Sequence, residues 1–246
     1  MLMEQTLQDL RAFKLTGMAN ALTNQLEQPK SYDLSFEERL SLLVEAEKID
    51  RKDKRLERLM KAGKLRHNAC IEDIDYSLTR GIKKEQISSL FSCQWIRESF
   101  NLLITGSTGT GKSWLGCAFG QQACRQGLSV LYIRFSLLLE KIRLSRVDGT
   151  YAKLLKNLLK TDLLIIDDWL LEPLEAKDRH SILEIMEDRY ERKALLITSQ
   201  MPTQNWHEMI QEPTLADAIL DRILSKSIKI ELKGESMRKV KKYSAS

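Results

Sequence analysis

A glycine-rich segment at residues 106–113 carries the clearest chemical signal in the sequence. It reads Gly-Ser-Thr-Gly-Thr-Gly-Lys-Ser, which matches the spacing of a phosphate-binding loop. Glycines allow the backbone to wrap around phosphate groups with its N–H groups turned inward. The predicted phosphate-binding residues are Gly106, Ser107, Thr108, Gly109, Thr110, Gly111, Lys112 and Ser113.

Lys112 and Ser113 have separate chemical tasks in such a loop. The lysine ammonium neutralises charge on the β- and γ-phosphates, and the serine hydroxyl ligates magnesium. The helix expected to start near Ser113 adds its positive N-terminal end. We therefore predict ATP and Mg2+ as cofactors. A glycine-rich turn that binds no nucleotide is the alternative, and the position of the loop between a predicted strand and a predicted helix argues against it.

Two adjacent carboxylates follow an apolar segment later in the chain. Residues 163–166 read Leu-Leu-Ile-Ile and lead directly into Asp167 and Asp168. A carboxylate at the tip of a buried strand beside the loop is where the second magnesium contact comes from, so we assign this role to Asp167. Asp168 is then placed to orient and polarise the attacking water. Many ATPases of this type carry glutamate there, and the shorter side chain bears on the rate of hydrolysis.

Three further polar residues are catalytic candidates at the γ-phosphate: Gln200, Arg222 and Arg238. Gln200 follows the apolar segment 194–198, and a polar group at such a strand end can hold the attacking water. An arginine stabilises the charge of the transition state and can come from a neighbouring subunit, which requires an oligomer. The alternatives are an ordinary strand boundary for Gln200 and surface ion pairs for the two arginines.

These residues need a scaffold that brings several strand ends to one edge of a sheet. From residue 100 onward, apolar segments of strand length alternate with segments of helical pattern. We predict strands at 100–105, 129–133, 163–166, 194–198 and 227–232, and helices that include 113–126 and 176–192. Continuously apolar strands separated by helices indicate a parallel sheet covered on both faces. Ligands bind at the carboxyl edge of such a sheet.

Residues 1–66 follow a different pattern, with helical periodicity and almost no strand signal. We expect an amphipathic stretch that breaks near Gly17. Further on, Ser35 and Glu38 form a capping-box sequence, in which each side chain satisfies the other residue's backbone N–H at the start of a helix. This long helix is predicted to end near Gly63.

The net charge of +5 hides an uneven distribution of basic residues. Residues 48–66 carry nine Lys/Arg against three Asp/Glu, residues 141–160 six against one, and residues 222–242 eight against two. Basic segments in an otherwise acidic chain are expected of a polyanion-binding protein, although any one segment could be a solvated helix face. The candidate DNA contacts are Lys141, Arg143, Arg146, Lys153 and Lys156.

The composition argues against several other classes of protein. No apolar segment is long enough for a membrane span, and the first residues lack the basic-then-apolar order of a secretion signal. The four cysteines show no pairing pattern, which fits reduced thiols in a cytoplasm. Three scattered histidines give little support for a metal site beyond magnesium. We therefore expect a cytoplasmic protein without a membrane partner.

Taken together, the motifs resemble those of the IstB-type helper ATPases of bacterial insertion sequences, an AAA+ group related to the DnaC-type helicase loaders. The resemblance spans nearly the full length. It rests on the phosphate loop and on the segments 36–43, 71–76, 164–169, 189–192, 197–202, 220–222 and 234–238. The loop alone is shared by many unrelated enzymes, but its combination with Thr-Ser-Gln-x-Pro, Asp-Arg and Gly-Glu-Ser-x-Arg is much narrower.

The resemblance implies an α/β AAA+ P-loop fold with a parallel sheet flanked by helices. It implies a helical N-terminal domain at 1–68, an ATPase domain at 69–246 and a reduced or absent C-terminal lid. In that scheme Gln200 matches the sensor-1 position, Arg222 the arginine finger and Arg238 the sensor-2 arginine.

The same resemblance implies a protein that binds DNA, expected to be double-stranded, in an ATP-dependent way. Such a protein forms a homo-oligomer on DNA and recruits and stimulates the transposase of its insertion sequence, with ATP hydrolysis as the switch. A helicase loader, which shares the ATPase core but prefers single-stranded DNA, is the first alternative. A small-molecule kinase is the second, and the three basic segments argue against it.

Overall fold

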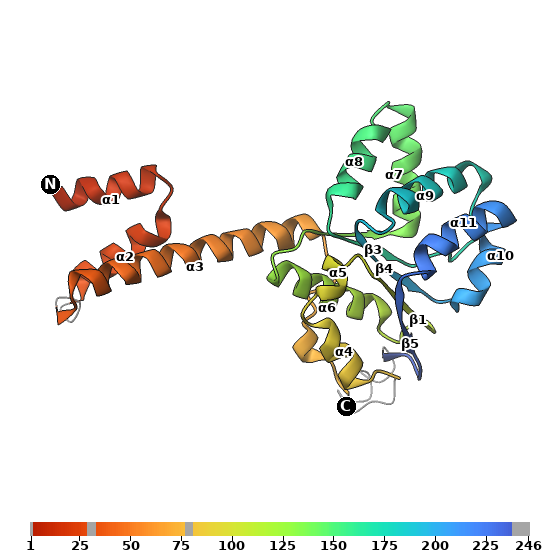
Figure 1. Ribbon diagram of the computed structural model, residues 1–246, viewed down its shortest axis with the longest axis horizontal. Coiled ribbons are helices and arrows are strands. Elements are labelled where there is room, and N and C mark those ends of the chain that lie inside the picture. Colours follow the sequence, from red (N-terminus) through yellow and green to blue (C-terminus); the bar gives the residue numbers. More distant parts are fainter. Residues whose placement is uncertain (1, 29–32, 77–80, 238–246) are drawn as a thin grey trace, which may run out of the picture. The chain divides into compact units, whose positions relative to one another are not determined.

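A computed structural model of the chain describes residues 2–28, 33–76 and 81–237. The chain forms two compact units, Met1–Arg58 and Leu59–Ser246. The described part of the first unit is helical, and the second contains a parallel sheet with helices on both faces (Figure 1). The division between the units falls inside the long helix α3 (Phe36–Gly63).

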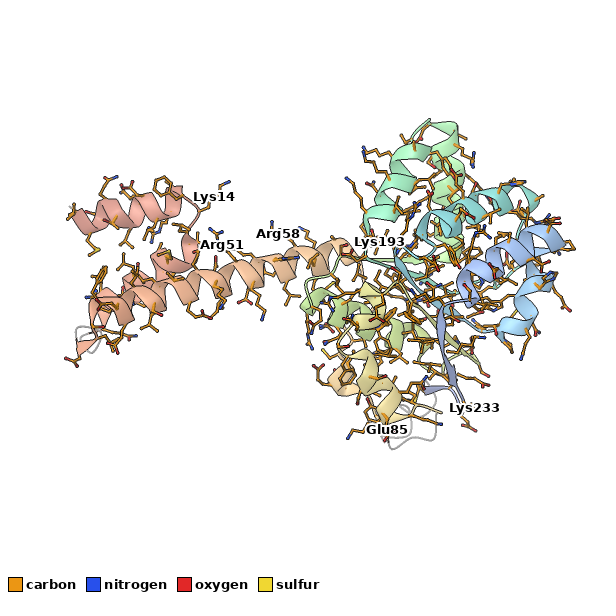
Figure 2. The ribbon with its side chains drawn as sticks, viewed as in Figure 1. Lys14, Arg51, Arg58, Glu85, Lys193 and Lys233 are labelled. Carbon is orange, nitrogen blue, oxygen red and sulfur yellow. The ribbon has the colours of Figure 1, made fainter. Side chains whose placement is uncertain are left out.

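The first unit contains α1 (Leu2–Ala12), α2 (Thr16–Glu27) and most of α3. The predicted capping box is confirmed at the start of α3. The backbone N–H of Ser35 donates to Glu38 Oε2 at 2.8 Å, and the N–H of Glu38 donates to Ser35 Oγ at 3.2 Å. The helix ends at Gly63, as predicted, and Figure 2 shows Arg51 and Arg58 of its basic segment along it.

The predicted break near Gly17 is confirmed, because α1 ends at Ala12 and α2 begins at Thr16. Gly17 itself is the second residue of α2 and has a packing role. A Cβ at this position would come within 2.6 Å of Ala46 O and of Glu47 Cα on α3. Glycine is needed because the two helices approach closely, so tertiary packing outweighs its low helix propensity. The break itself lies between α1 and α2, where Lys14 has a φ of 61°.

All five predicted strands are present, and the sheet is entirely parallel. They are β1 (Asn101–Gly106), β2 (Val130–Arg134), β3 (Leu163–Asp167), β4 (Ala194–Ser199) and β5 (Ser227–Leu232). Their order is β2-β3-β4-β1-β5. Because β1 lies next to β4, and β4 next to β3, the ends of these three strands meet at one edge.

Helices cover both faces of the sheet (Figure 1). They are α6 (Lys112–Arg125) on one face and α7 (Phe135–Val147), α8 (Tyr151–Lys160), α9 (Ala176–Arg189), α10 (Trp206–Ile210) and α11 (Pro213–Leu224) on the other. Shorter elements complete the unit: η2 (Ile71–Asp73), α4 (Lys84–Leu90), α5 (Gln94–Arg97) and η3 (Thr203–Asn205). None of the described helices is both long and apolar enough to cross a membrane.

The core explains why the strands are apolar along their whole length. Leu103 and Ile166 point into a cluster on the α7–α11 face, together with the fully buried Trp169 and Trp206. On the opposite face α6 lies so close that a Cβ on Gly120 would come within 2.8 Å of Ile165. In β1 to β4 neither face is left to water, so neither side of these strands carries a run of polar residues. The edge strand β5 is the exception, because Ser227, Lys229 and Glu231 alternate with its apolar residues and the last two are exposed.

The chain after β5 is described only as far as residue 237. The expected reduced or absent C-terminal lid therefore stays a prediction.

Candidate nucleotide-binding site

The loop at 106–113 connects β1 to α6, as the motif requires. Gly109 and Gly111 have φ values of 82° and 95°, in the left-handed region that side chains with a Cβ rarely adopt. The hydroxyl of Thr110 donates to the carbonyl of Ser107 at 2.8 Å and braces the turn. The loop therefore has the backbone conformation of an anion-binding concavity at the start of a helix.

Lys112 lies within this loop and is only 6% exposed. Its Nζ donates to the carbonyl of Ser107 at 2.8 Å. Burial lowers the pKa of Lys112, and the carboxylates of Asp168 and Asp167 oppose that shift. An anionic phosphate would favour the charged form in the same way, so the ammonium is positioned to bind one.

Asp167 ends β3 and is fully buried among hydroxyl groups. Ser113 Oγ donates to Asp167 Oδ1 at 2.8 Å, and Tyr132 donates to Oδ2 at 2.5 Å. Thr198 Oγ1 on β4 also donates to Oδ1. Three hydroxyl donors from three different elements therefore fix the orientation of this carboxylate.

The pairing of Ser113 with Asp167 fits the expected magnesium ion. It places a hydroxyl oxygen and a carboxylate oxygen side by side next to the phosphate loop. Mg2+ prefers such oxygen ligands and is usually held through one or two carboxylates together with substrate phosphates. These residues would hold the ion, which when bound neutralises charge on the β- and γ-phosphates. Elsewhere in the described ranges, no group of three or more His, Cys, Asp or Glu side chains could hold a metal.

Tyr132 and Thr198 are site residues that the sequence patterns do not identify. Tyr132 lies in the middle of an apolar strand, where an aromatic residue normally indicates core packing. Burial, together with the neighbouring Asp167, raises the pKa of Tyr132, so its hydroxyl stays protonated and donates. The polar run that begins at Thr198 was the only available signal for that residue.

Asp168 and Gln200 both lie at the carboxyl edge of the sheet. Asp168 has a φ of 58°, and its N–H donates to Thr198 Oγ1 at 3.2 Å. A left-handed conformation in a non-glycine residue costs free energy and is common at functional sites. Gln200 directly follows β4 and is exposed. Both residues are therefore placed near the loop, and their roles toward water and the γ-phosphate stay predictions.

Arg222 lies at the opposite edge of the sheet from the loop. Its backbone carbonyl accepts a hydrogen bond from the side chain of Asn101, the first residue of β1, at 3.3 Å. The loop begins at the other end of the same strand. The Arg222 guanidinium forms an ion pair with Glu187 and donates to the carbonyl of Ala218 at 2.7 Å. It is therefore not part of the nucleotide site of its own chain.

Arg238 lies outside the described residues, but the segment before it contacts the loop. The N–H of Met237 donates to the carbonyl of Gly109 at 2.9 Å. A Cβ on Gly109 would come within 2.1 Å of Ser236 Oγ. The Gly-Glu-Ser motif therefore packs directly against the phosphate loop.

The five candidate DNA contacts on α7 and α8 fall into two groups. Lys141 and Lys153 line one open cavity of about 360 Å³, and Lys156 is exposed. Arg143 and Arg146 instead bind groups on α9.

Arg143 and Arg146 are both engaged within the chain. Arg143 forms ion pairs with Glu175, at 2.8 Å, and with the buried Asp178. The hydrogen bonds that Arg143 donates to the Asp178 carboxylate raise the pKa of Arg143. Arg146 donates to Ser181 Oγ at 2.9 Å and stacks over the Tyr151 ring. These contacts fix α7 against α9 and α8.

The sequence of this chain matches a known protein family. The family model described as IstB-like ATP binding protein matches residues 8–245. An insertion-sequence ATP-binding protein of Sinorhizobium fredii is 46% identical over 239 residues, which cover 97% of this chain and 98% of that protein. Another, from Pseudomonas fluorescens, is 47% identical over 204 residues, which cover 82% of this chain and 88% of that protein.

Solved structures support the fold. The crystal structure of DnaI matches with a TM-score of 0.56 and 20% identity, covering 72% of this chain and 94% of that one. AMPPCP-bound DnaA from Aquifex aeolicus matches with a TM-score of 0.55 and 20% identity, covering 74% and 55%. Because the family model covers almost the whole chain and the phosphate loop is complete, this protein belongs to the IstB-like ATP-binding family and is a P-loop ATPase with the AAA+ fold.

Proposed function

We propose that this protein is an ATP-dependent DNA-binding helper of transposition. In this proposal it assembles as a homo-oligomer on double-stranded DNA and recruits and stimulates the transposase of its insertion sequence. ATP hydrolysis acts as the switch between assembly and release. The proposal is supported by the names of the relatives, which are insertion-sequence ATP-binding proteins, and by unpaired basic side chains on α7 and α8.

The position of Arg222 is the main observation that supports the proposed oligomer. This arginine lies at the amino end of β1, whereas the phosphate loop lies at the carboxyl end of the same strand. An arginine that stabilises the γ-phosphate must approach it directly. We therefore infer that Arg222 acts on the nucleotide of a neighbouring subunit, and that a complete catalytic site requires two chains.

The hydrolysis step follows from the groups at the carboxyl edge. Asp168 and Gln200 orient a water molecule toward the γ-phosphorus. The bond between this phosphorus and the β–γ bridging oxygen breaks as the water oxygen attacks, which yields ADP and inorganic phosphate. Lys112 and the loop N–H groups stabilise the negative charge on the phosphates, and Arg222 from the neighbour does so at the γ-phosphate.

We assign DNA contacts first to Lys141, Lys153 and Lys156, which are exposed on α7 and α8. Arg143 and Arg146 would contact DNA only by giving up their partners on α9. In this proposal they mainly hold the two helices in place. DNA of either strandedness would be bound through phosphates, with affinity that falls as salt rises.

We assign the transposase contact to the helical N-terminal domain, proposed as residues 1–68, and ATP turnover to residues 69–246. The first compact unit exposes several large apolar side chains. Phe13 is 73% exposed, Phe36 74% and Val44 53%. Exposed apolar groups that gather in one small unit are typical of a protein-binding surface.

A mixing experiment tests the shared site. Lys112→Ala removes the phosphate-binding lysine, and Arg222→Ala removes the arginine proposed to act in the neighbouring subunit. We expect each variant alone to lose DNA-stimulated ATPase activity. A mixture should recover part of it, because the intact loop of an Arg222→Ala chain can meet the intact arginine of a Lys112→Ala chain.

Recovery in the mixture requires the two residues to act in one site from different chains. If the mixture stays as inactive as the separate variants, although chains of both kinds are found together in assemblies on DNA, the shared site is wrong. Preference for single-stranded over double-stranded DNA, with no stimulation of the transposase, would instead favour a helicase loader.

A further inference from the structure

A second open cavity, of about 560 Å³, lies at the end of β2 within the larger unit. Its wall combines the chain just after α3 with β2 and the first turns of α7. Four basic side chains line it: Lys64, Arg66, Arg134 and Lys141. Glu140 is the single acidic side chain in the lining. The cavity is therefore strongly cationic. Lys141 is one of the five candidate DNA contacts, and Lys64 and Arg66 belong to the basic segment 48–66.

The four basic groups differ from their neighbours Arg143 and Arg146 in having no acidic partner. None of them forms an ion pair with a carboxylate in residues 2–28, 33–76 or 81–237. Arg143 and Arg146, close by in sequence, are both engaged with α9. Four unpaired cations around one concavity favour an anionic ligand.

The geometry of the lining suits phosphate in particular. Arg66 and Arg134 can each offer two parallel N–H donors to one phosphate, and the two lysines add point charges. A DNA backbone presents phosphates at a regular spacing.

The cavity also reaches the nucleotide site through one side chain. Tyr132 forms part of the cavity lining, and its hydroxyl donates to Asp167 Oδ2 at 2.5 Å. A phenol has one proton to donate, so it can serve Asp167 or an anion in the cavity, but not both at once.

We propose that this cavity binds backbone phosphates of DNA, and that Tyr132 links its occupancy to the magnesium-binding carboxylate Asp167. The inference rests on the DNA-binding function proposed above and adds a site and a route of coupling to it. Arg66, Arg134, Lys64 and Lys141 hold the phosphates. A phosphate oxygen that accepts from the Tyr132 hydroxyl releases Asp167 Oδ2 for the nucleotide site. Tyr132 is a positioning residue, because it acts on the reaction only through Asp167.

The binding half of the proposal is tested with the double variant Arg66→Ala/Arg134→Ala. Its control is Arg192→Ala, which removes an exposed arginine outside the cavity that has no ion pair among the described residues. Anisotropy titrations with a labelled 30-base-pair duplex, in a non-hydrolysable ATP analogue, give affinity at several salt concentrations. We expect the double variant to bind at least about 10-fold more weakly. The slope of its log association constant against log salt concentration should also become less negative by about two. The control should match the wild type.

Three outcomes of this titration are informative. Unchanged affinity and salt slope in the double variant, with normal wild-type binding, overturn the cavity but leave DNA binding intact. Failure of the wild type to bind any DNA overturns the proposed function itself. If inorganic triphosphate saturates a second site that the double variant lacks, while duplex affinity stays the same, the cavity serves free polyphosphate and the proposal is also wrong. Lys64→Ala, a single exposed change, repeats the test if the double variant is unstable.

The coupling half is tested with Tyr132→Phe, which keeps the ring and removes the hydroxyl. The measurement is the affinity for a fluorescent ATP analogue with and without saturating duplex. In the wild type we expect DNA to change this affinity several-fold. In Tyr132→Phe the ratio should fall to about one, because the hydroxyl that links the cavity to Asp167 is absent. An unchanged ratio would show that Tyr132 only packs against Asp167, and would overturn the coupling.

Discussion

The phosphate loop differs from the basic surface near α7 in how it is built to bind phosphate. This surface consists of the basic residues that line the two cavities, Lys64, Arg66, Arg134, Lys141 and Lys153. In the loop, one buried lysine lies within a backbone that Gly109 and Gly111 bend through positive φ values, which residues with a Cβ rarely adopt. Near α7, the cationic groups are exposed side chains on separate elements. The first arrangement is preorganised for one triphosphate. The second is suited to a long polyanion whose affinity comes from many weak contacts.

A second contrast lies within the basic surface itself. Arg143 and Arg146 have acidic or hydroxyl partners on α9, whereas Lys141 and Lys153 line an open cavity. All four come from the same basic segment of the sequence. Net charge of a segment therefore does not identify its ligand-binding residues, because some of its cations are already neutralised by the fold.

Raising the salt concentration should have the largest effect, because it should weaken duplex binding far more than nucleotide binding. If four phosphates are contacted, raising salt from 50 to 300 mM should weaken duplex binding by several hundred-fold, from a slope of about −0.9 per contact. Binding of an ATP analogue to the loop should change far less, since its contacts are short and buried. Both are measured by titration in the same buffers. Equal duplex affinity at the two salt concentrations would remove the basis for the DNA-binding surface.

Lys112→Ala should have the next largest effect, on the loop alone. Loss of a charge-assisted contact to phosphate costs about 1.5–3 kcal/mol, which corresponds to about 10- to 150-fold in affinity. Titration with a fluorescent ATP analogue measures it, and circular dichroism checks the fold. We also expect Lys112→Ala on its own to lose nucleotide-dependent assembly on DNA, and to join assemblies only when mixed with chains whose loop is intact. Normal ATP-dependent assemblies formed by this variant would contradict the switch mechanism.

Gly109→Ala tests how far the loop depends on its glycines, with Gly149→Ala as a matched control. Both glycines have positive φ, 82° and 73°, but a Cβ at 109 would collide with Ser236 whereas one at 149 meets nothing within 4 Å. We expect Gly149→Ala to lower the unfolding free energy by about 1 kcal/mol from backbone strain, and Gly109→Ala to cost clearly more. Urea denaturation measures both.

Adding Ser236→Gly to the Gly109→Ala variant should recover the part of the loss that comes from the collision. Equal costs for the two single glycine variants would mean that the segment 234–237 does not hold its place on the loop.

The smallest expected effects come from Arg143→Ala and Lys141→Ala, and they should be opposite in kind. Removing Arg143 leaves the buried Asp178 carboxylate without its ion-pair partner, which should lower the unfolding free energy by about 1–2 kcal/mol. DNA affinity should then change little. Lys141→Ala should leave the melting temperature unchanged and weaken duplex binding about 2- to 5-fold. The reverse pattern would mean that Arg143, not Lys141, faces the DNA.

Much of the ATP site could be predicted because its parts are local in sequence. The phosphate loop is one continuous segment, and Asp167 follows directly after an apolar strand. Both signals depend only on neighbouring residues and on the rule that ligands bind at the carboxyl edge of a parallel sheet. The capping box of Ser35 and Glu38 was predictable for the same reason.

Other features could not be predicted, because they depend on which elements become neighbours. Gly17 has the sequence context of a helix break, but the approach of α3 makes it a packing residue. Arg189 also belongs to a family motif, and the structure places it in the core. It is 1% exposed and donates to the carbonyls of Ala194 and Thr161, at 2.6 and 3.1 Å. Burial lowers the pKa of Arg189 to about 9.

By itself, the sequence determined the order of strands and helices, the phosphate loop and the carboxylate that follows β3, because short-range periodicity and spacing encode them. Only the tertiary structure decided that Tyr132 contacts Asp167, that Arg222 lies at the far edge of the sheet, and which cations remain unpaired. These facts depend on the lateral order of the strands and on helix packing. Contacts between residues that are distant in the chain leave no periodic signal in the sequence.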